Sequence, residues 1–406
     1  MRAYVVASGQ RIEPFGELAR DLPIGNEPLH QIQRRLFERF GLTMVEVERL
    51  EDVPTDAPRL VTYDNVYFTR RVLKSFLSLW RGRPAEAVQL ALPEDSTFVR
   101  QFGDLQDFER RTPHVLFRFF AYPAGPPVSA APLPVIYRER LLEVPVPHHV
   151  SPTLIWPHPL TSSVVFHVRH WLHLLEANRL SIQIRWIDEV ITKPWYTAAL
   201  LLRALPPWPG RGKLLWRVLS SANRVHSTAD VHPSARLEGC MIGPGARVGA
   251  QAFLRGVLVG EKATIEERAN VAYSVIGPGC YVSKIASIYG SVGLAEGSLG
   301  MSMQLCVAGR RVVLTPRATP MDLNPGGPIR VKDGDRLVEV QHRILGAALG
   351  HGVFLGPDVF LAPGRAIPNG TIVGPHPGRV LSIVPNDRAG RYSVIQGGTL
   401  VDPPSG

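Results

Sequence analysis

The stretch VHPSARLEGCMIGPGARVGAQAFLRGVLVGEKATIEERANVAYSVIGPGCYVSKIASIYG, residues 231–290, decides the fold of the C-terminal half. An aliphatic residue returns every five or six positions, and Ile242, Val259 and Ile276 follow one another at a constant interval. Three short segments within each interval describe one turn of a three-sided coil, a period that neither an α-helix nor a hairpin shows. We therefore predict a solenoid that stacks its aliphatic side chains turn upon turn. The repeating positions are Val231, Leu237, Ile242, Val248, Leu254, Val259, Ile265, Val271, Ile276, Val282 and Ile288.

Small residues support tight corners in this coil. Alanine or cysteine often stands four positions after an aliphatic residue, as at Ala246, Ala263 and Cys280. A small inward side chain lets the chain turn sharply at that point. Residues 293–343 lack the pattern, so we expect a long loop or small insertion that projects from the coil. The spacing then returns at Leu349, Leu355, Leu361, Ile367 and Val373.

This recurring spacing resembles the hexapeptide-repeat family, whose members fold as left-handed parallel β-helices. The left-handed winding is implied by the resemblance, because parallel crossovers in general are right-handed. The resemblance also implies a homotrimer, and acyl transfer from acetyl-CoA at sites between neighbouring coils. Members without chemistry exist too, which leaves a structural role open.

The composition is that of an ordinary globular chain. Of 406 residues, 45% are hydrophobic and 20% are charged, which fits one to three domains. Three cysteines are too few for a disulfide framework and lack zinc-site spacing. The N-terminus has no signal-peptide pattern, and no apolar stretch is long enough to span a bilayer. We therefore expect a cytoplasmic protein.

The net charge of +10 comes mostly from arginine, because only six of the 45 basic residues are lysine. Such a surplus can attract phosphates, anionic lipid or nucleic acid. No dense basic run or aromatic–basic motif is present, so we favour a solvated surface and expect no nucleic-acid partner. Residues 213–225, KLLWRVLSSANRV, predict a basic amphipathic helix. It could lie on an anionic membrane, but we favour a cap beneath the first coil.

The N-terminal half alternates short strands with helices, which predicts an α/β domain with a mixed or parallel sheet. We expect strands at RAYVVASG, at RLVTYDNVYF and at SIQIRWIDEV, residues 181–190. Helices are expected over Glu27–Gly41, over Thr161–Leu180 and in KPWYTAALLLRAL, residues 193–205.

Three segments of this half resemble sugar-phosphate nucleotidylyltransferases. VVASGQRIEPF and LPIGNEPLHQIQRRL are similar to that family's opening strand, glycine-rich phosphate loop and first helix. VTYDNVYF and WIDEVITKPWYTAALL are similar to its two carboxylate-bearing segments. In the bifunctional nucleotidylyltransferase–acetyltransferases a left-handed β-helix follows such a domain, and RILGAALGHGVFLGPDVFLAPGRAIPNG resembles their archaeal-type members.

The resemblance implies roles for five residues. Asp64 and Asp188 would end their strands and hold Mg²⁺ for in-line attack. Gly9 and Arg11 would bind the nucleotide, and Arg11 and Arg20 would neutralise its phosphates during catalysis. The alternative, which we rank slightly ahead of metal binding, is that both acids serve turns and caps.

Three departures from the family pattern weaken the case for nucleotidylyl transfer. The loop ASGQR has one glycine and therefore offers few backbone donors. Arg20 stands where the family has lysine, and its planar guanidinium has a different geometry. Only the short segment 42–63 separates Gly41 from Asp64, which leaves no room for the usual base-reading segment.

Acyl transfer would need a histidine base near the coenzyme A thioester. His351 is the candidate for this role, and its alternative is a solvated corner histidine. The segment that carries the family's catalytic histidine reads GLAEGSLGMSMQLCVAGRR in this chain and contains none. The other candidates are His342, His232 and His226.

Three further histidines, His167, His170 and His173, are spaced by three in HVRHWLH. On a helix they would share one side, as metal ligands do. No carboxylate or cysteine nearby in the sequence completes a ligand set, so we favour a surface or domain-contact stripe.

The sequence thus predicts a shortened nucleotidyltransferase-like α/β domain followed by a left-handed β-helix. The leading interpretation is a transferase-family protein of sugar-nucleotide or cell-envelope metabolism that binds a sugar phosphate or a nucleotide, with nucleotidylyl transfer weakened or lost. The alternatives are a non-catalytic assembly or regulatory protein and a hexapeptide-repeat acyltransferase. The expected boundaries are 1–205 for the α/β domain, 206–226 for the linker, 227–385 for the β-helix with its insertion 293–343, and 386–406 for the tail.

Overall fold

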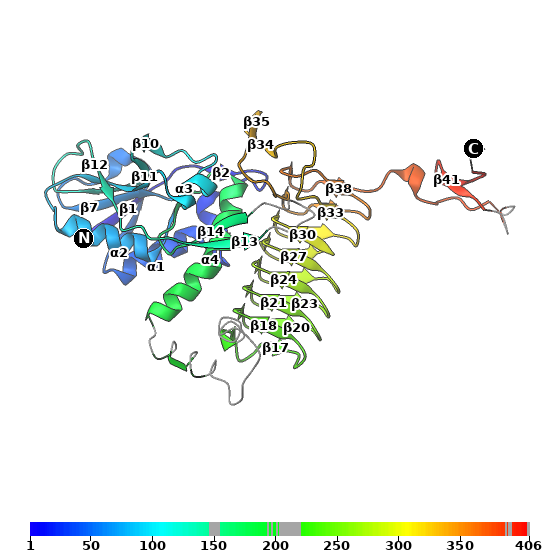
Figure 1. Cartoon of the computed structure of the whole chain (residues 1–406). Coiled ribbons are helices and arrows are strands. Elements are labelled where there is room, and N and C mark those ends of the chain that lie inside the picture. The colour runs from blue at the N-terminus through cyan, green and yellow to red at the C-terminus, as the bar shows by residue number, and fades with distance from the viewer. Residues whose placement is uncertain are drawn as a thin grey trace.

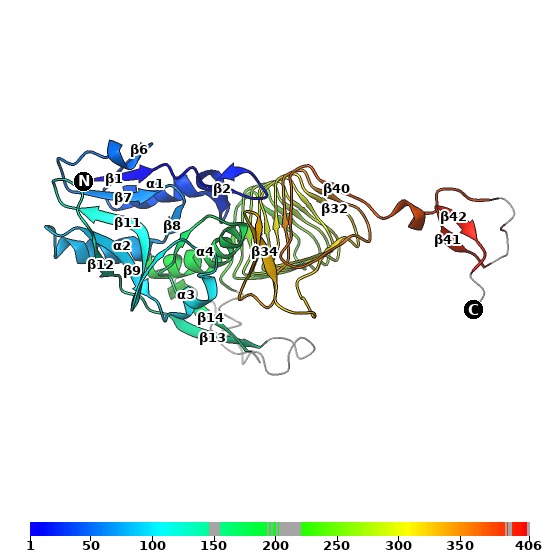
Figure 2. The same cartoon turned by 90° about the horizontal axis from the view of Figure 1, so that it is seen from above.

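The computed structural model describes residues 1–145, 155–192, 221–385 and 392–403, and the single residues 195, 198, 199, 202 and 388. An N-terminal α/β domain lies beside a C-terminal β-helix, and the helix α4 runs between them (Figure 1). Seen from above, the coils stack into a prism whose strands run across its faces (Figure 2).

The C-terminal half is a left-handed parallel β-helix, as the sequence predicts. Ile242 pairs with Val259, and Val259 pairs with Ile276, so that each partner lies one coil further along the chain. The predicted aliphatic positions from Ile242 to Ile288 are all buried, each no more than 4% exposed. The stacked interior therefore forms one continuous apolar core, which is the source of stability in a solenoid.

Three sheets make the sides of the prism. The first contains β16 (Arg224–Val225), β19 (Met241–Ile242), β22 (Leu258–Val259), β25 (Val275–Ile276), β28 (Val292–Gly293), β31 (Val307–Ala308), β36 (Ala348–Leu349) and β39 (Ala366–Ile367). The second contains β17 (Asp230–Val231), β20 (Arg247–Val248), β23 (Thr264–Ile265), β26 (Tyr281–Val282), β29 (Ser298–Leu299), β32 (Val313–Leu314), β37 (Phe354–Leu355) and β40 (Ile372–Val373). The third contains β18 (Arg236–Glu238), β21 (Phe253–Arg255), β24 (Asn270–Ala272), β27 (Ser287–Tyr289) and β30 (Ser302–Gln304), and β33 (Thr319–Pro320) pairs separately with β38 (Phe360–Leu361).

The excursion from the coil is shorter than the expected 293–343. Val275 pairs with Val292 at the regular interval, but Val292 pairs with Val307, which comes earlier in the sequence than the repeat requires. This shortened coil shifts the phase of the repeat, which is why a fixed spacing does not detect it. Residues up to β33 stay in the prism, and only about 321–346 leave it as the hairpin β34 (Arg330–Asp333) and β35 (Arg336–Glu339).

The N-terminal domain is built on a mixed sheet in the order β12-β9-β11-β7-β1-β6. β1 runs parallel to β6 and β7, and β11 runs antiparallel to β7 and β9. The bounds are β1 (Arg2–Val6), β6 (Thr43–Val47), β7 (Arg59–Tyr63), β9 (Val88–Pro93), β11 (His114–Tyr122) and β12 (Ala131–Pro134), with β10 (Glu109–Arg111) paired to β11. Small hairpins surround the sheet: β2 (Arg11–Ile12) with β3 (Glu17–Leu18), β4 (Pro23–Ile24) with β5 (Glu27–Pro28), β13 (Arg140–Pro145) with β14 (Ile155–Leu160), and β8 (Val66–Phe68) with β15 (Val165–His167).

The helices confirm one prediction and correct two. α1 (Leu29–Arg39) lies where the apolar face predicts it, and α2 (Arg70–Arg81) and α3 (Thr97–Phe102) follow. The predicted strand at residues 181–190 is wrong, because these residues belong to α4 (Trp171–Thr192). The helix predicted over 161–180 begins only at Trp171 and is preceded by β15. Burial between two domains outweighs the strand preference of the isoleucines in this segment.

α4 and the hairpin β34–β35 join the two domains. α4 contacts β25 and β31, and the indole N–H of Trp186 donates to the Gly239 carbonyl at 2.9 Å. Val331 of the hairpin is fully buried in the same apolar cluster as the N-terminal core. The hairpin projects from the coil, as expected, and packs against the first domain (Figure 1).

Most of the predicted linker helix at 213–225 and most of 193–205 lie outside the described residues, but the prediction is wrong at its end, where Arg224–Val225 form the strand β16. Beyond the coils, η3 (Pro377–Arg379) and the hairpin β41 (Val394–Gln396) with β42 (Thr399–Val401) form the tail. None of the helices that the structure describes is long and apolar enough to cross a membrane.

Candidate functional site

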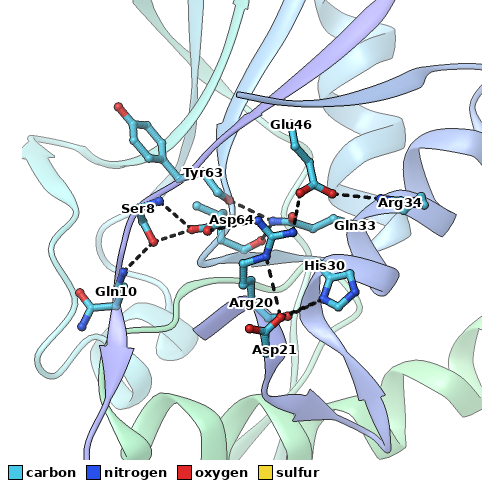
Figure 3. Close-up of polar contacts among 11 residues, drawn as sticks. Ser8, Gln10, Arg20, Asp21, His30, Gln33, Arg34, Glu46, Tyr63 and Asp64 are labelled. Atoms are coloured by element: carbon cyan, nitrogen blue, oxygen red, sulfur yellow. Dashed lines mark hydrogen bonds and ion pairs between the residues drawn. The ribbon is translucent and has the colours of Figure 1, made fainter. Parts of the chain in front are cut away.

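The carboxyl ends of β1 and β7 bring Ser8 and Asp64 together, at the edge where ligands bind in open α/β sheets (Figure 3). Asp64 is 3% exposed, and its Oδ1 accepts hydrogen bonds from the Ser8 N–H at 2.9 Å and the Ser8 hydroxyl at 2.5 Å. The side-chain amide of Gln33 donates to the carbonyls of Tyr63 and Val66. The turn between β7 and β8 is therefore fixed from both sides.

Arg20 supplies the positive charge of this cluster. Its guanidinium lies 4.0 Å from Asp64 Oδ2 and donates to Glu46 at 2.5 Å, while Arg34 holds the other oxygen of Glu46 at 3.0 Å (Figure 3). The hydrogen bond from Arg20 lowers the pKa of Glu46, and the same bond raises the pKa of Arg20. The expected phosphate-neutralising arginine thus already contacts two carboxylates of its own chain, and Asp21 lies 3.9 Å away.

Gly9 and Arg11 belong to the loop that is expected to bind the nucleotide, and they follow Ser8 of this cluster in the sequence. Gly9 has φ +65°, and no other group lies within 4 Å of the position that a Cβ would take there. Arg11 begins β2 on the surface and donates to the Gly16 carbonyl at 2.6 Å. Arg11 therefore stabilises the β2–β3 hairpin, and its nucleotide-binding role stays a prediction.

Asp188 does not end a strand, which corrects the geometry expected for the carboxylate pair. It lies in α4, with Arg70 of α2 at 3.9 Å from its Oδ1. Among the described residues, no three His, Cys, Asp or Glu side chains are grouped so that they could hold a metal ion. A guanidinium beside Asp64 would also repel a divalent cation. The residues at this edge therefore do not fit Mg²⁺.

His167, His170 and His173 do not share one side of a helix, because His167 belongs to β15 and α4 begins after His170. Nδ1 of His167 lies 2.7 Å from Asp107, while His170 contacts the Lys332 carbonyl at 3.1 Å. His173 contacts the Asp104 carbonyl at 2.8 Å, and burial lowers its pKa to about 3 and that of His170 to about 4. Each ring has its own partner, and His170 lies at a domain contact, in line with the interpretation that we favour over metal binding.

His351 lies where a corner of the β-helix meets the β2–β3 hairpin. Its Nδ1 accepts the backbone N–H of Arg310 at 2.8 Å, so the ring proton is on Nε2, which lies 2.6 Å from the Glu17 carboxylate. Arg310 also contacts Glu17. Burial, together with Arg310 and Arg311, lowers the pKa of His351 to about 4.

The surroundings of His351 show an interdomain contact and no solvated corner residue. Its side chain is 17% exposed, and its backbone N–H donates to the Asn369 side chain at 2.6 Å. Asn369 in turn donates to the Phe15 carbonyl at 2.9 Å, and the Phe15 ring lies 5.5 Å from the imidazole. The lone pair of Nδ1 accepts the Arg310 N–H, and the protonated Nε2 faces Glu17, so His351 has no free lone pair in this arrangement.

His342, from the end of the hairpin excursion, is a second buried junction. Its Nε2 lies 3.2 Å from Glu176 of α4, and its Nδ1 lies 3.8 Å from Asp104. Burial alone would lower the pKa of His342, but the two carboxylates raise it to about 9. Burial likewise opposes ionisation of Glu176, but Arg179 and His342 lower its pKa to about 2. The charged His342 therefore connects the end of the hairpin excursion to the N-terminal domain through these two carboxylates.

The two histidines of the first coil are exposed and have local partners. His226 Nδ1 lies 2.9 Å from the Thr228 hydroxyl, and His232 Nδ1 lies 2.8 Å from the Ser234 hydroxyl. Each ring also accepts the backbone N–H of that same serine or threonine. These contacts order the corners of the coil.

No protein-family model matches this chain, and no curated protein matches it. Three of the solved structures that match this chain each cover 38% of it. The acetyltransferase domain of PglB from Neisseria gonorrhoeae is 21% identical, with 55% of that chain covered and a TM-score of 0.20. A hexapeptide transferase family protein from Anaplasma phagocytophilum is 20% identical, with 75% covered and a TM-score of 0.23. A mutant perosamine N-acetyltransferase from Caulobacter crescentus, in complex with CoA and GDP-perosamine, is 15% identical, with 53% covered and a TM-score of 0.18.

Proposed function

We propose that this chain is a transferase-type protein of sugar-nucleotide or cell-envelope metabolism that binds a sugar phosphate or a nucleotide and no longer performs metal-dependent nucleotidylyl transfer. One observation carries the proposal: the Arg20 guanidinium lies against Asp64 and Glu46 at the strand edge. Metal-dependent transfer needs a divalent cation between the carboxylate and the phosphates. Arg20 already pairs with these carboxylates, and Arg34 pairs with Glu46, so a Mg²⁺ ion at Asp64 would have to displace the Arg20 guanidinium.

Retained binding is supported by the loop after β1 and by the charge of the chain. The loop passes the carboxyl end of β1 with Gly9 in the left-handed region, which brings backbone close to any ligand at that edge. The net charge of +10 favours phosphorylated ligands over neutral ones. The resemblance of the surrounding segments to sugar-phosphate nucleotidylyltransferases indicates which phosphorylated ligands to test first.

The experiment measures pyrophosphate release from nucleoside triphosphates and sugar phosphates, together with thermal shifts, in Mg²⁺ and in EDTA. We expect no pyrophosphate release, and a thermal shift with at least one ligand that is the same in both conditions, because specific binding stabilises the folded state. Asp64→Asn tests the edge, and Asp56→Asn on the exposed surface is the matched control. Mg²⁺-dependent release that Asp64→Asn abolishes and Asp56→Asn leaves intact would refute the proposal.

Acyl transfer from acetyl-CoA is the second candidate function. The observation that favours it is the imidazole–carboxylate pair of His351 and Glu17, 2.6 Å apart at a coil corner. His351 would have to release Glu17 or the Arg310 N–H before it could take a proton from an acceptor. Thiol release from acetyl-CoA with amino-sugar acceptors tests this reaction. It should be lost in His351→Asn and retained in His226→Asn, which alters an exposed corner histidine.

The remaining candidate is a non-catalytic assembly or regulatory protein. If the full chain gives neither a thermal shift with these ligands nor thiol release, this role becomes the better account. Assembly as a homotrimer through the coils stays a prediction, and the mass of the full chain in solution, measured by light scattering, tests it.

A further inference from the structure

A cavity of about 430 Å³ lies where α1, the start of α2, the second half of α4 and the first coil meet. α1, α2 and α4 lie close to one another on the side of the molecule that faces the first coils (Figure 1). Its size is within the range of small-molecule sites. Asp188, which the sequence places at a metal site, lines this cavity instead.

The cavity wall is rich in arginine. Among the described residues that line it are five guanidinium groups and two carboxylates, those of Glu27 and Asp188, so the described part of the wall carries more positive than negative charge. The carboxylates are already paired: Arg35 donates twice to Glu27 at 2.9 Å, and Arg70 lies 3.9 Å from Asp188. The guanidinium groups are those of Arg35, Arg39, Arg70, Arg185 and Arg224.

Two donors in the wall lack an acceptor among the described residues. Nε of Arg70 is buried without a hydrogen-bond partner, although buried N–H groups are nearly always paired. Tyr67 is 4% exposed, and its hydroxyl takes part in no hydrogen bond within the described residues. Tyr67 itself lines the cavity, together with Arg185 and Asp188. Burial raises the pKa of Tyr67, which keeps its O–H available as a donor.

We propose that this cavity binds a small molecule that carries a phosphate group, held by Arg70 and Arg185 and oriented by the Tyr67 hydroxyl. Guanidinium groups bind phosphate oxygens through paired, charge-assisted hydrogen bonds. Asp188 and Glu27 would accept hydrogen bonds from hydroxyl groups on the remainder of the ligand. The proposal goes beyond the function proposed above, because it does not involve the Asp64 edge and holds equally for an acyltransferase or an assembly protein.

The position of the cavity gives the ligand a structural consequence. Arg185 and Asp188 belong to α4 of the first domain, while Arg224 and Met241 belong to strands of the first two coils. A ligand in the cavity therefore contacts both domains. Its binding strengthens their junction and stabilises the folded chain as a whole.

Isothermal titration calorimetry of the full chain with ribose 5-phosphate, pyrophosphate and ribose tests the site. We expect ribose 5-phosphate or pyrophosphate to bind once per chain, more weakly at high salt, and ribose not to bind. The compound that binds more tightly shows whether the cavity fits a single phosphate with hydroxyl groups or a diphosphate better. Both titrations run in EDTA, which excludes metal-dependent binding, and the Arg70→Gln variant distinguishes this cavity from the metal-independent binding proposed at the Asp64 edge.

Three variants identify the site. Arg70→Gln should weaken binding at least tenfold, and Tyr67→Phe, which removes a single oxygen, several-fold. Arg81→Gln is the matched control, because Arg81 ends the same helix α2 as Arg70 but is exposed and does not line the cavity. Melting temperatures close to that of the wild type show that each variant folds.

No heat of binding for either phosphate, or equal affinities in Arg70→Gln and Arg81→Gln, would overturn the proposal. These results are independent of the pyrophosphate-release assay. Nucleotidylyl transfer could be detected while the cavity stays empty, and the cavity could bind phosphate in a chain without any transfer activity.

Discussion

Replacing His342 with glutamine should remove a pH-dependent part of the stability of the domain junction. His342 lies between Glu176 and Asp104, which raise its pKa from 6.5 to about 9. A group whose pKa is higher in the folded state stabilises that state fully below its unfolded value and loses the effect as the pH rises through its folded value. The contribution is therefore complete below pH 6.5 and lost by about pH 9.

The magnitude follows from the same two values. The interval between 6.5 and about 9, at about 1.4 kcal/mol for each pH unit, gives a contribution of about 3 kcal/mol. This agrees with the range of about 3–5 kcal/mol for the loss of one partner from a buried ion pair. Glu176 titrates in a different window, because its lowered pKa of about 2 affects stability only in acid.

The assay is urea-induced unfolding of the full chain between about pH 6 and about pH 9.5, which spans the window set by this pKa. We expect the wild type to exceed His342→Gln by about 3 kcal/mol near pH 6.5 and to approach it near pH 9. His226→Gln, at an exposed histidine, should parallel the wild type throughout. A difference between wild type and His342→Gln that does not change across this range would refute the reasoning.

Two further predictions test the packing of the coils and of the junction. Gly277→Ala would drive its Cβ into the backbone carbonyl of Leu294 in the next coil, so its midpoint in urea should fall sharply, by a loss of about 3 kcal/mol or more. Gly374→Ala, where nothing lies within 4 Å of the added Cβ, should unfold like the wild type; equal losses in both variants would contradict the close approach. Trp186→Phe removes the N–H donated to the first coils at 2.9 Å and should cost about 1 kcal/mol in the same titration, and no loss would show that the bond does not contribute to the junction.

The β-helix can be predicted from the sequence because its repeat is local. Each buried position, such as Val248 or Ile265, recurs one coil later and pairs with its equivalent there. The prediction is inaccurate only where the coil shortens, because Ser287 pairs with Ser302, which comes before the position that the regular repeat requires. Residues 293–320 then look like an insertion although they continue the prism.

The contacts between the domains cannot be predicted in the same way. Glu17 meets His351, and Glu176 meets His342, although the partners lie far apart in the sequence. No spacing or motif in the sequence predicts such pairs. The approach of the two partners depends on how the first domain, including α4, packs against the coils. The prediction for the segment that contains Asp188 is wrong for a related reason, since its isoleucines favour a strand locally and only tertiary packing makes it helical.

The cluster at the strand edge is predicted in part. The sequence places Asp64 at the end of its strand and Arg20 near it, and the structure brings the two side chains to 4.0 Å. It does not indicate Glu46, which stands in no recognisable motif, or the bond from Ser8 to Asp64, because the position of Ser8 in the loop ASGQR does not show which carboxylate it contacts. With these two partners, Asp64 belongs to an internal network of ion pairs and hydrogen bonds, where the sequence predicts a metal site.

The most direct test of the account is the binding of Mn²⁺, as a spectroscopic substitute for Mg²⁺, to the full chain in the presence of a nucleoside triphosphate. Electron paramagnetic resonance reports how much of the ion the protein removes from solution. Because the Arg20 guanidinium already pairs with Asp64 and Glu46, the account predicts that wild type and Asp64→Asn leave the same Mn²⁺ signal as the nucleotide alone. One Mn²⁺ bound per chain in the wild type and released in Asp64→Asn would contradict it.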